Sequence, residues 1–276
     1  MSRFAPLLAV LLVSRAAGAA DVCPRGNDPT AGPLAGGIGP ADFGAVPEAC
    51  GATDASLRLR AGLLVASTMP DYYGSFLGAA TLRGRYQLGP RSTFSFAADA
   101  FNYRYINGGG LASHTVSAGP ATAAFHQMFV VGAETAMSLY GRVLLPLDSA
   151  RQNSVATGLE LGSSLRIPAG ARWVIDGGVV LTAPAEIVGG QIRARLEPAA
   201  LAEAWLRLRP GVALCGGAHV RLTVAPAFDL FTVVPRLGAR FALRRRFWAA
   251  ALLEFPVAGS DRTDLIAGLF AGYTPN

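Results

Sequence analysis

The sequence contains no lysine, so all 24 basic residues of the 276-residue chain are arginines. Charged side chains make up only 15% of the chain, whereas ordinary soluble domains carry roughly 25%. The net charge is +6, but the arginines are scattered, and the longest basic block is residues 244–246. This scatter gives no concentrated basic patch, so we expect no nucleic-acid partner.

A long apolar run is also missing, because no stretch of about 18 uncharged apolar residues occurs after the N-terminus. The N-terminus itself combines Arg3, a short apolar core at residues 4–13 and small residues at 17–20. This arrangement predicts a secretory signal peptide over residues 1–20 and export of the remainder. An exported membrane protein without a spanning helix has to be a β-barrel.

Cysteine is scarce, at three residues. Cys23 and Cys50 bracket a segment rich in glycine and proline, and we expect them to pair, because export permits disulfides. Cys215 is left over, and we expect it to be a small buried residue at a turn, with its role open. The cysteines form no CxxC motif and no Cys/His pair, so we predict no metal site and no cofactor.

Residues 21–54 form an extension without strand-length periodicity. Two interpretations remain open for it: a disordered periplasmic lead-in, or a small plug in the mouth of a barrel, stiffened by the disulfide. Residues 55–276 are the predicted barrel.

An alternation of apolar and polar residues with period 2 runs from Ser56 to the end of the chain. It divides into segments of roughly ten to fifteen residues, a length that suits tilted membrane spans. The links alternate between short ones (LGPRS, FHQM, IPAGA, LCGGA, LRRR) and generally longer ones (TMPDYYGS, INGGGLAS, PLDSARQN, the stretch 184–198, VAGSDRT), with FTVVP as a short exception. The pattern predicts an all-β fold, a transmembrane antiparallel up-and-down β-barrel of about 12 strands. Ten or fourteen strands are also compatible, because QIRARLEP could be a strand of its own.

The alternation also orients the strands. With the apolar phase towards lipid, the other phase collects most of the charges, which at mid-depth on the lipid face would cost roughly 2–4 kcal/mol each. A soluble two-layer sandwich shows similar alternation, but its surface is usually denser in charge. The predicted lumen-lining residues are Arg58, Arg60, Arg83, Arg85, Asp99, Glu134, Arg142, Glu160, Arg166, Asp176, Arg207, Arg221, Arg240 and Glu254, with Glu203, Arg209, Asp229 and Arg244 on the same phase.

The surplus of arginine in this set has two interpretations. Arginines beside acids across strands form structural ladders that offset buried charge. Alternatively, rings of arginine favour anion entry into a narrow pore. Arg58, Arg60, Arg83 and Arg85 lie on adjacent strands without acids nearby in sequence, so they are the best candidates for a positive stripe. After Ala100 the alternation changes phase, which indicates either a β-bulge near Phe101 or the exit of the strand from the membrane.

No residue pattern indicates catalysis. His114, His126 and His219 lack the His-x-Ser arrangement of outer-membrane lipid hydrolases, and no GxSxG or phosphate-binding loop occurs. We place His126 in a turn and His219 at the start of a strand, and we expect the protein not to be an enzyme.

Two segments, GRVLLPLDSARQNSVATGLELGSSL and LLEFPVAGSDRTDLIAGLFAGY, resemble hairpins of outer-membrane transporter-type barrels, including those associated with uptake of aromatic compounds. The resemblance implies passage of a small solute and transfers no binding residue. The last strand, residues 265–273, also resembles the C-terminal signal by which the barrel-assembly machinery recognises its substrates, although residues 274–276 follow the final aromatic.

These observations predict an outer-membrane channel or transporter for small solutes, leaning towards anions, embedded in outer-membrane lipid. A non-conducting structural or adhesive barrel with a charge-filled lumen is the alternative. The sequence leaves the solute and the oligomeric state open.

Overall fold

The computed structural model describes residues 23, 30, 43–50, 53–66, 73–108, 111–131, 135–147, 154–188, 190–224, 230–244, 246–255, 257 and 265–274. The predicted signal peptide and Glu134 lie outside these residues. No helix within the described part of the chain is long and apolar enough to cross a membrane. The strands are β1 (Asp54–Ala66), β2 (Tyr73–Gly89), β3 (Ser92–Gly108), β4 (Leu111–Ser117), β5 (Ala121–Val131), β6 (Thr135–Leu145), β7 (Ser154–Ala169), β8 (Trp173–Val188), β9 (Gln191–Ala194), β10 (Glu197–Arg209), β11 (Val212–Thr223), β12 (Leu230–Ala242), β13 (Phe247–Glu254) and β14 (Leu265–Tyr273).

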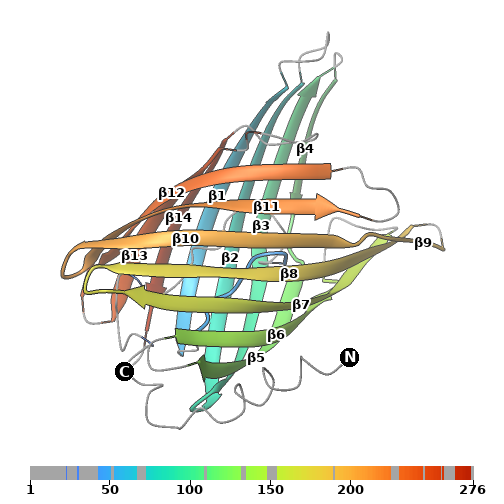
Figure 1. Ribbon diagram of the computed structural model, residues 1–276. Coiled ribbons are helices and arrows are strands. Elements are labelled where there is room, and N and C mark those ends of the chain that lie inside the picture. The colour runs from blue at the N-terminus through green and yellow to red at the C-terminus, as the bar shows by residue number, and fades with distance from the viewer. Residues whose placement is uncertain are drawn as a thin grey trace.

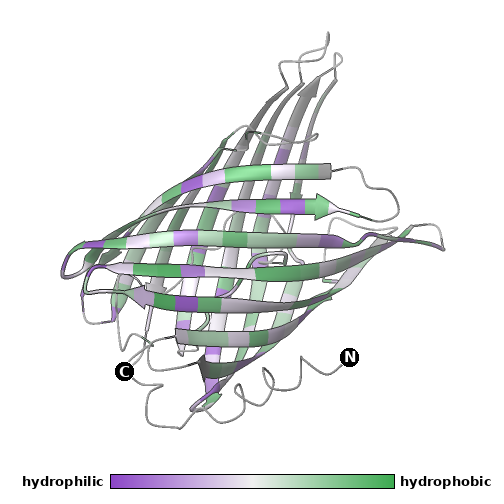
Figure 2. Ribbon diagram, viewed as in Figure 1, coloured by the Kyte–Doolittle hydropathy of each residue, from purple (hydrophilic) through white to green (hydrophobic). Residues whose placement is uncertain are grey.

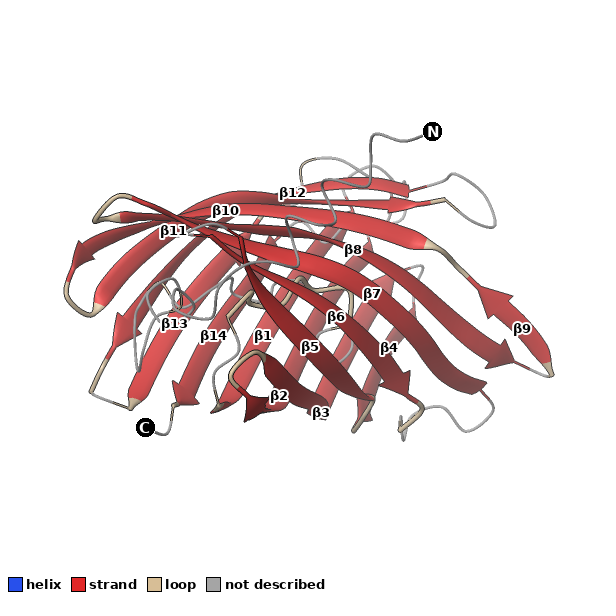
Figure 3. Cartoon of the chain, turned by 60° about the horizontal axis from the view of Figure 1, so that its bottom comes forward, coloured by secondary structure: helices blue, strands red, loops and turns tan. Residues whose placement is uncertain are grey.

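Twelve of these strands close into one antiparallel barrel (Figures 1 and 3). Each strand pairs with the next in sequence, apart from the two extra strands, and the ring is completed where β14 pairs with β1 and where β10 pairs with β8. The two extra strands extend the rim of the barrel. β4 pairs with the C-terminal part of β3, and β9 forms a hairpin with the C-terminal end of β8. The prediction of a 12-stranded up-and-down barrel is therefore confirmed, and QIRARLEP does contain a short strand, β9.

Three of the predicted links are wrong. FHQM (residues 125–128) continues β5, LCGGA (residues 214–218) lies inside β11, and FTVVP (residues 231–235) lies inside β12. In β11 the glycines mark close packing rather than a turn, because a Cβ on Gly217 would meet the backbone of Ala202 and Glu203. The turn before β11 is made by Pro210 and Gly211, and Gly211 has a φ of +83° that favours glycine.

The strands expose one phase of the alternation and bury the other. Along β6, buried and more accessible residues alternate without interruption. In β7, Leu161 is 66% exposed while its neighbour Glu160 is 1% exposed. Figure 2 shows the resulting bands of apolar and polar residues along the strands. Apolar side chains such as Leu59, Leu82 and Phe96 therefore cover the outside of the barrel, as a lipid-facing surface requires.

The phase change in β3 comes from a β-bulge. Ala80 of β2 pairs with Phe101, whereas the next residue, Thr81, pairs with Asp99, so Ala100 is an extra residue in β3. One inserted residue reverses the faces of all residues beyond it. Of the two interpretations of the sequence, the bulge is confirmed.

Candidate functional site: the lumen and the segment inside it

Most predicted lumen residues have buried side chains. Arg207 and Arg221 are only half-buried, and Glu134 lies outside the described residues. The following are each at most 9% exposed: Arg58, Arg60, Arg83, Arg85, Asp99, Arg142, Glu160, Arg166, Asp176, Arg240 and Glu254. Since the outer face of the same strands is apolar, this polar set occupies the interior of the barrel.

Ion pairs between neighbouring strands organise much of this interior. Arg142 Nη1 of β6 lies 2.8 Å from Glu160 Oε1 of β7. Arg166 Nη1 of β7 lies 3.1 Å from Asp176 Oδ2 of β8, and Arg236 of β12 faces Glu254 of β13 at 3.8 Å. Each pair is almost fully buried, so these charges offset one another inside the barrel.

Two of the four arginines of β1 and β2, Arg60 and Arg85, have acids beside them and so are not part of the uncompensated stripe that the sequence suggests. Arg85 donates from Nε and Nη2 to the two carboxylate oxygens of Asp54, at 2.7 and 2.8 Å. Arg60 donates to Thr81 at 2.6 Å and lies 3.4 Å from Asp99. The pairing register of the strands places these acids next to the arginines, since Asp54 is the direct partner of Arg85. The pairing is not visible in the sequence, because the two residues are far apart along the chain.

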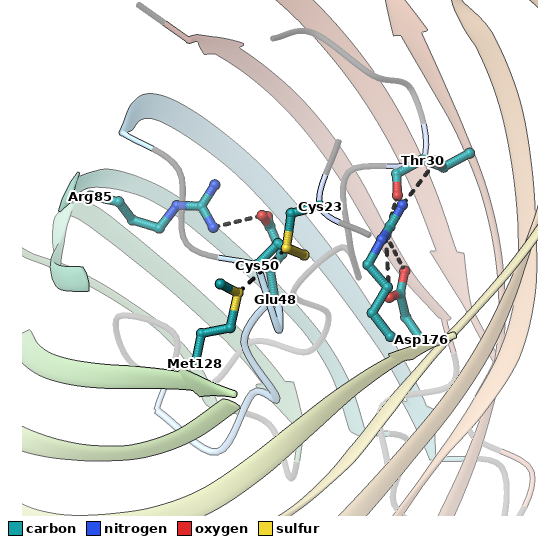
Figure 4. The surroundings of a disulfide bond; sticks show 8 residues. Cys23, Thr30, Glu48, Cys50, Arg85, Met128 and Asp176 are labelled. Carbon is teal, nitrogen blue, oxygen red and sulfur yellow. Dashed lines mark hydrogen bonds and ion pairs between the residues drawn. A yellow bond between two sulfur atoms is a disulfide. The ribbon is translucent and has the colours of Figure 1, made fainter. Parts of the chain in front are cut away.

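The predicted disulfide between Cys23 and Cys50 is present, with the Cα atoms 5.5 Å apart. It lies inside the barrel (Figure 4), where Cys23 Sγ is 3.4 Å from Met128 Sδ of β5. Ala49 and Cys50 are buried in one cluster with Met128 and Ala136. The two ends of the bracketed segment are therefore held against the wall of the lumen.

The described residues of this segment also bind other walls. Glu48 accepts a hydrogen bond of 2.6 Å from Arg85 Nη1 of β2. The backbone N–H of Gly44 donates to Glu160 Oε2 at 2.6 Å, and the Ala45 carbonyl accepts from Arg142 at 3.2 Å. The carbonyl of Thr30, a residue that is fully buried, accepts from Arg166 (Figure 4). These contacts reach β2, β6 and β7, which are not all neighbours in the barrel.

Apolar side chains of the segment fit against glycines of the wall. Phe43 is 6% exposed, and a Cβ on Gly158 of β7 would come within 2.8 Å of its ring. Val46 is 4% exposed, and a Cβ on Gly178 of β8 would come within 2.7 Å of it. The glycines of β7 and β8 thus leave the space that the segment occupies.

One side of the lumen is apolar, which the alternation alone did not predict. The buried residues Trp205, Trp248, Leu252 and Phe270 form a cluster contributed by β10, β13 and β14. The Arg240 guanidinium lies 4.1 Å from the centre of the Trp248 ring, an arrangement that favours a cation. Apart from Glu254 at its end, β13 is apolar on both faces, so most of its sequence, FWAAALLE, carries no polar phase to mark the lumen.

The histidines and the free cysteine are distributed over β4, β5 and β11. His126 lies within β5 and not in a turn, and its Nε2 is 2.9 Å from Ser95 Oγ. Cys215 lies within β11 and not at a turn, and it is buried. Within the described ranges, no group of three or more His, Cys, Asp or Glu side chains is placed to hold a metal ion.

Comparison with solved structures gives several similar barrels. An outer membrane channel from Pseudomonas putida F1 is 16% identical, with a TM-score of 0.62, over 87% of this chain and 100% of that one. The β domain of the Bordetella autotransporter BrkA is 10% identical, with a TM-score of 0.54, over 81% and 100% of the two chains. The translocator domain of the autotransporter NalP from Neisseria meningitidis is 12% identical, with a TM-score of 0.53, over 81% and 88%.

No family model matches the sequence, and no curated protein matches it. At these identities the likenesses show the fold. The chain has the fold of outer-membrane β-barrels, with an apolar outer face, a largely polar lumen and a described part of its N-terminal segment inside.

Proposed function

We propose that the protein is an outer-membrane channel for small solutes and that its N-terminal segment closes the lumen at rest. The contacts of residues 43–50 with the barrel wall carry this proposal. Three contacts hold the segment to the wall, namely the hydrogen bonds to Glu160 and from Arg142 and the ion pair with Arg85, and the disulfide closes the segment on itself. A disordered lead-in has no reason to make such contacts.

The fit of the segment supports a removable plug rather than a fixed core. Among residues 43–50, the polar contacts described above come from the Glu48 side chain and from backbone groups of Gly44 and Ala45, and the apolar side chains of Phe43 and Val46 fill the space beside glycines. The likeness to an outer membrane channel from P. putida agrees with a conducting role. We further propose that β14, whose apolar residues alternate up to Tyr273, is the strand that the barrel-assembly machinery recognises.

The charge inside the lumen supports only a mild preference for anions. Among the described buried side chains of the barrel, eight arginines face seven carboxylates; the acids are Asp54, Asp99, Glu160, Asp176, Glu197, Glu203 and Glu254. Glu48 of the segment adds a further carboxylate beside Arg85. Removal of the segment therefore leaves the lumen slightly more positive than it is at rest.

The test compares the full-length protein with a variant that lacks residues 21–52, so that Thr53 and Asp54 remain. Both are recovered from the outer-membrane fraction, checked for heat-modifiable migration on gels, and inserted into planar bilayers. We expect the deletion variant to conduct ions severalfold better than the full-length protein. Equal conductance contradicts the plug, and two silent barrels contradict the channel and favour the structural alternative.

A further inference from the structure

A cavity of about 780 Å³ lies at the end of the barrel opposite the start of β1 and the end of β14. It is formed where β7, β8 and β10 reach the rim and where β9 projects beyond it (Figures 1 and 3). Phe43 of the N-terminal segment lines the same cavity. Its volume is in the range of small-molecule sites, roughly 300–1,000 Å³, and neither the ion-pair ladder nor the disulfide accounts for it.

Positive charge predominates among the cavity's lining residues. Three guanidinium groups, those of Arg193, Arg195 and Arg221, face two carboxylates, those of Glu186 and Glu197. Glu197 is shared: its Oε2 lies 2.7 Å from Arg221 Nη2, and its Oε1 lies 3.8 Å from Arg195 Nε. Arg193 and Arg195 are exposed at the rim, so their donors can meet a solute that arrives from solvent.

The remainder of the lining is largely apolar. Phe43 and Leu144 are buried at 6% and 4% exposure, and Ala156, Ala185 and Ile192 complete the apolar surface. Phe43 is fixed in place, because its ring fits against Gly158. The cavity thus combines an apolar floor with cationic groups at its rim.

We propose that this cavity binds an amphipathic organic anion, a carboxylate attached to an apolar body. The planar guanidinium group presents paired donors that match the two oxygens of a carboxylate. A small hydrophilic anion does not cover the apolar floor of the cavity. An apolar cation is repelled by the surplus of arginine. The inference deepens the proposed function, since it names the solute class, and it rests on that function for the statement that the bound anion is a transported solute.

Binding is tested with full-length protein in lipid nanodiscs by isothermal titration calorimetry. The probes are octanoate, acetate, which lacks the apolar body, and octyltrimethylammonium, which reverses the charge. We expect octanoate to bind at one site and the other two to bind at least about tenfold more weakly. Equal affinity for octanoate and octyltrimethylammonium indicates nonspecific partition and overturns the inference, as does equal affinity for acetate.

The site is located with matched charge variants. Arg193→Gln removes an exposed rim arginine, and Arg172→Gln removes an exposed arginine from the β7–β8 turn at the opposite end. Because both residues are exposed, neither change disturbs the buried ion pairs between neighbouring strands. We expect Arg193→Gln to weaken octanoate binding by about tenfold, the loss of one charge-assisted hydrogen bond, while Arg172→Gln binds as the wild type does. The same affinity in both variants overturns the assignment to this cavity.

A separate measurement distinguishes this inference from the proposed function. Octanoate entry is followed in protein-free liposomes and in liposomes that contain the wild-type protein, the Arg193→Gln variant or the variant that lacks residues 21–52. Saturable entry above the protein-free rate that Arg193→Gln slows supports both proposals. Site-specific binding with no entry above the protein-free rate, both in the wild type and in the variant that lacks residues 21–52, supports the cavity and contradicts the channel. Entry above the protein-free rate that Arg193→Gln leaves unchanged supports the channel and contradicts the cavity as its solute site.

Discussion

Replacement of Arg142 by methionine separates the stability of the barrel from the retention of the segment. Arg142 forms a 2.8 Å ion pair with Glu160, and the two side chains are 5% and 0% exposed. It also donates to the Ala45 carbonyl. The change leaves the Glu160 carboxylate buried without this cation, which typically costs about 3–5 kcal/mol. We expect the free energy of unfolding to fall by approximately that amount.

The double variant Arg142→Met/Glu160→Met removes both charges. Replacement of a buried ion pair by apolar residues of similar volume is often neutral or stabilising, so we expect stability close to that of the wild type. Both contacts with the backbone at Gly44 and Ala45 are lost in this variant. Conductance should therefore rise in the double variant even though the barrel remains as stable.

Urea unfolding in phospholipid vesicles, followed by tryptophan fluorescence, measures the stability, and planar bilayers measure the conductance. If the free energy of unfolding of the single variant lies within about 1 kcal/mol of the wild-type value, the buried charge pair is refuted. A double variant as unstable as the single one refutes it also. A stable double variant with wild-type conductance refutes the role of these two contacts in closing the lumen.

Three further predictions concern the disulfide, the outer face and the ion preference. Reduction of the Cys23–Cys50 disulfide, which closes a 27-residue separation, should increase open-channel events in bilayers, because a loop of this size loses about 3.5 kcal/mol of restraint. Dithiothreitol should have no effect on a variant in which both cysteines are serine. Leu161→Arg, on the outer face near the middle of β7, should lower the free energy of unfolding by about 2–4 kcal/mol. Ile192→Arg, on the projecting hairpin, should change it by less than about 1 kcal/mol. Similar losses of stability at the two positions contradict the proposed membrane face. The reversal potential of the variant that lacks residues 21–52, under a salt gradient, should show mild anion preference, and a cation-selective channel contradicts the charge balance of the lumen.

The alternation of residues predicted the barrel, its outer face and about 12 strands, with ten or fourteen left open. This pattern is a direct consequence of strand geometry, in which successive side chains point to opposite faces. Links were harder to predict, because glycine and aromatic residues also occur inside barrel strands. In β11 the pair Gly216 and Gly217 resembles a turn in sequence, yet Gly217 packs against the backbone of β10 and Gly216 faces the side chain of Leu237 in β12.

The interior was harder to predict than the exterior. Asp54 and Glu48 lie in or beside the N-terminal extension, 31 and 37 residues before Arg85, yet both pair with it. The apolar side of the lumen, with Trp248 and Phe270, comes from β13 and β14, which are apolar on both faces apart from Glu254 at the end of β13. Contacts across the barrel depend on register and on the path of the segment, and neither is encoded in local periodicity.

The placement of the N-terminal segment in the lumen is tested most directly by hydroxyl-radical footprinting of the protein in outer-membrane vesicles. Phe43 and Met128 are the reporters, because they are 6% and 7% exposed in the structure. We predict that both are protected in the full-length protein and that Met128 is oxidised faster in the variant that lacks residues 21–52. Oxidation of Phe43 and Met128 in the full-length protein at the rate of the unfolded chain contradicts a segment held inside the barrel.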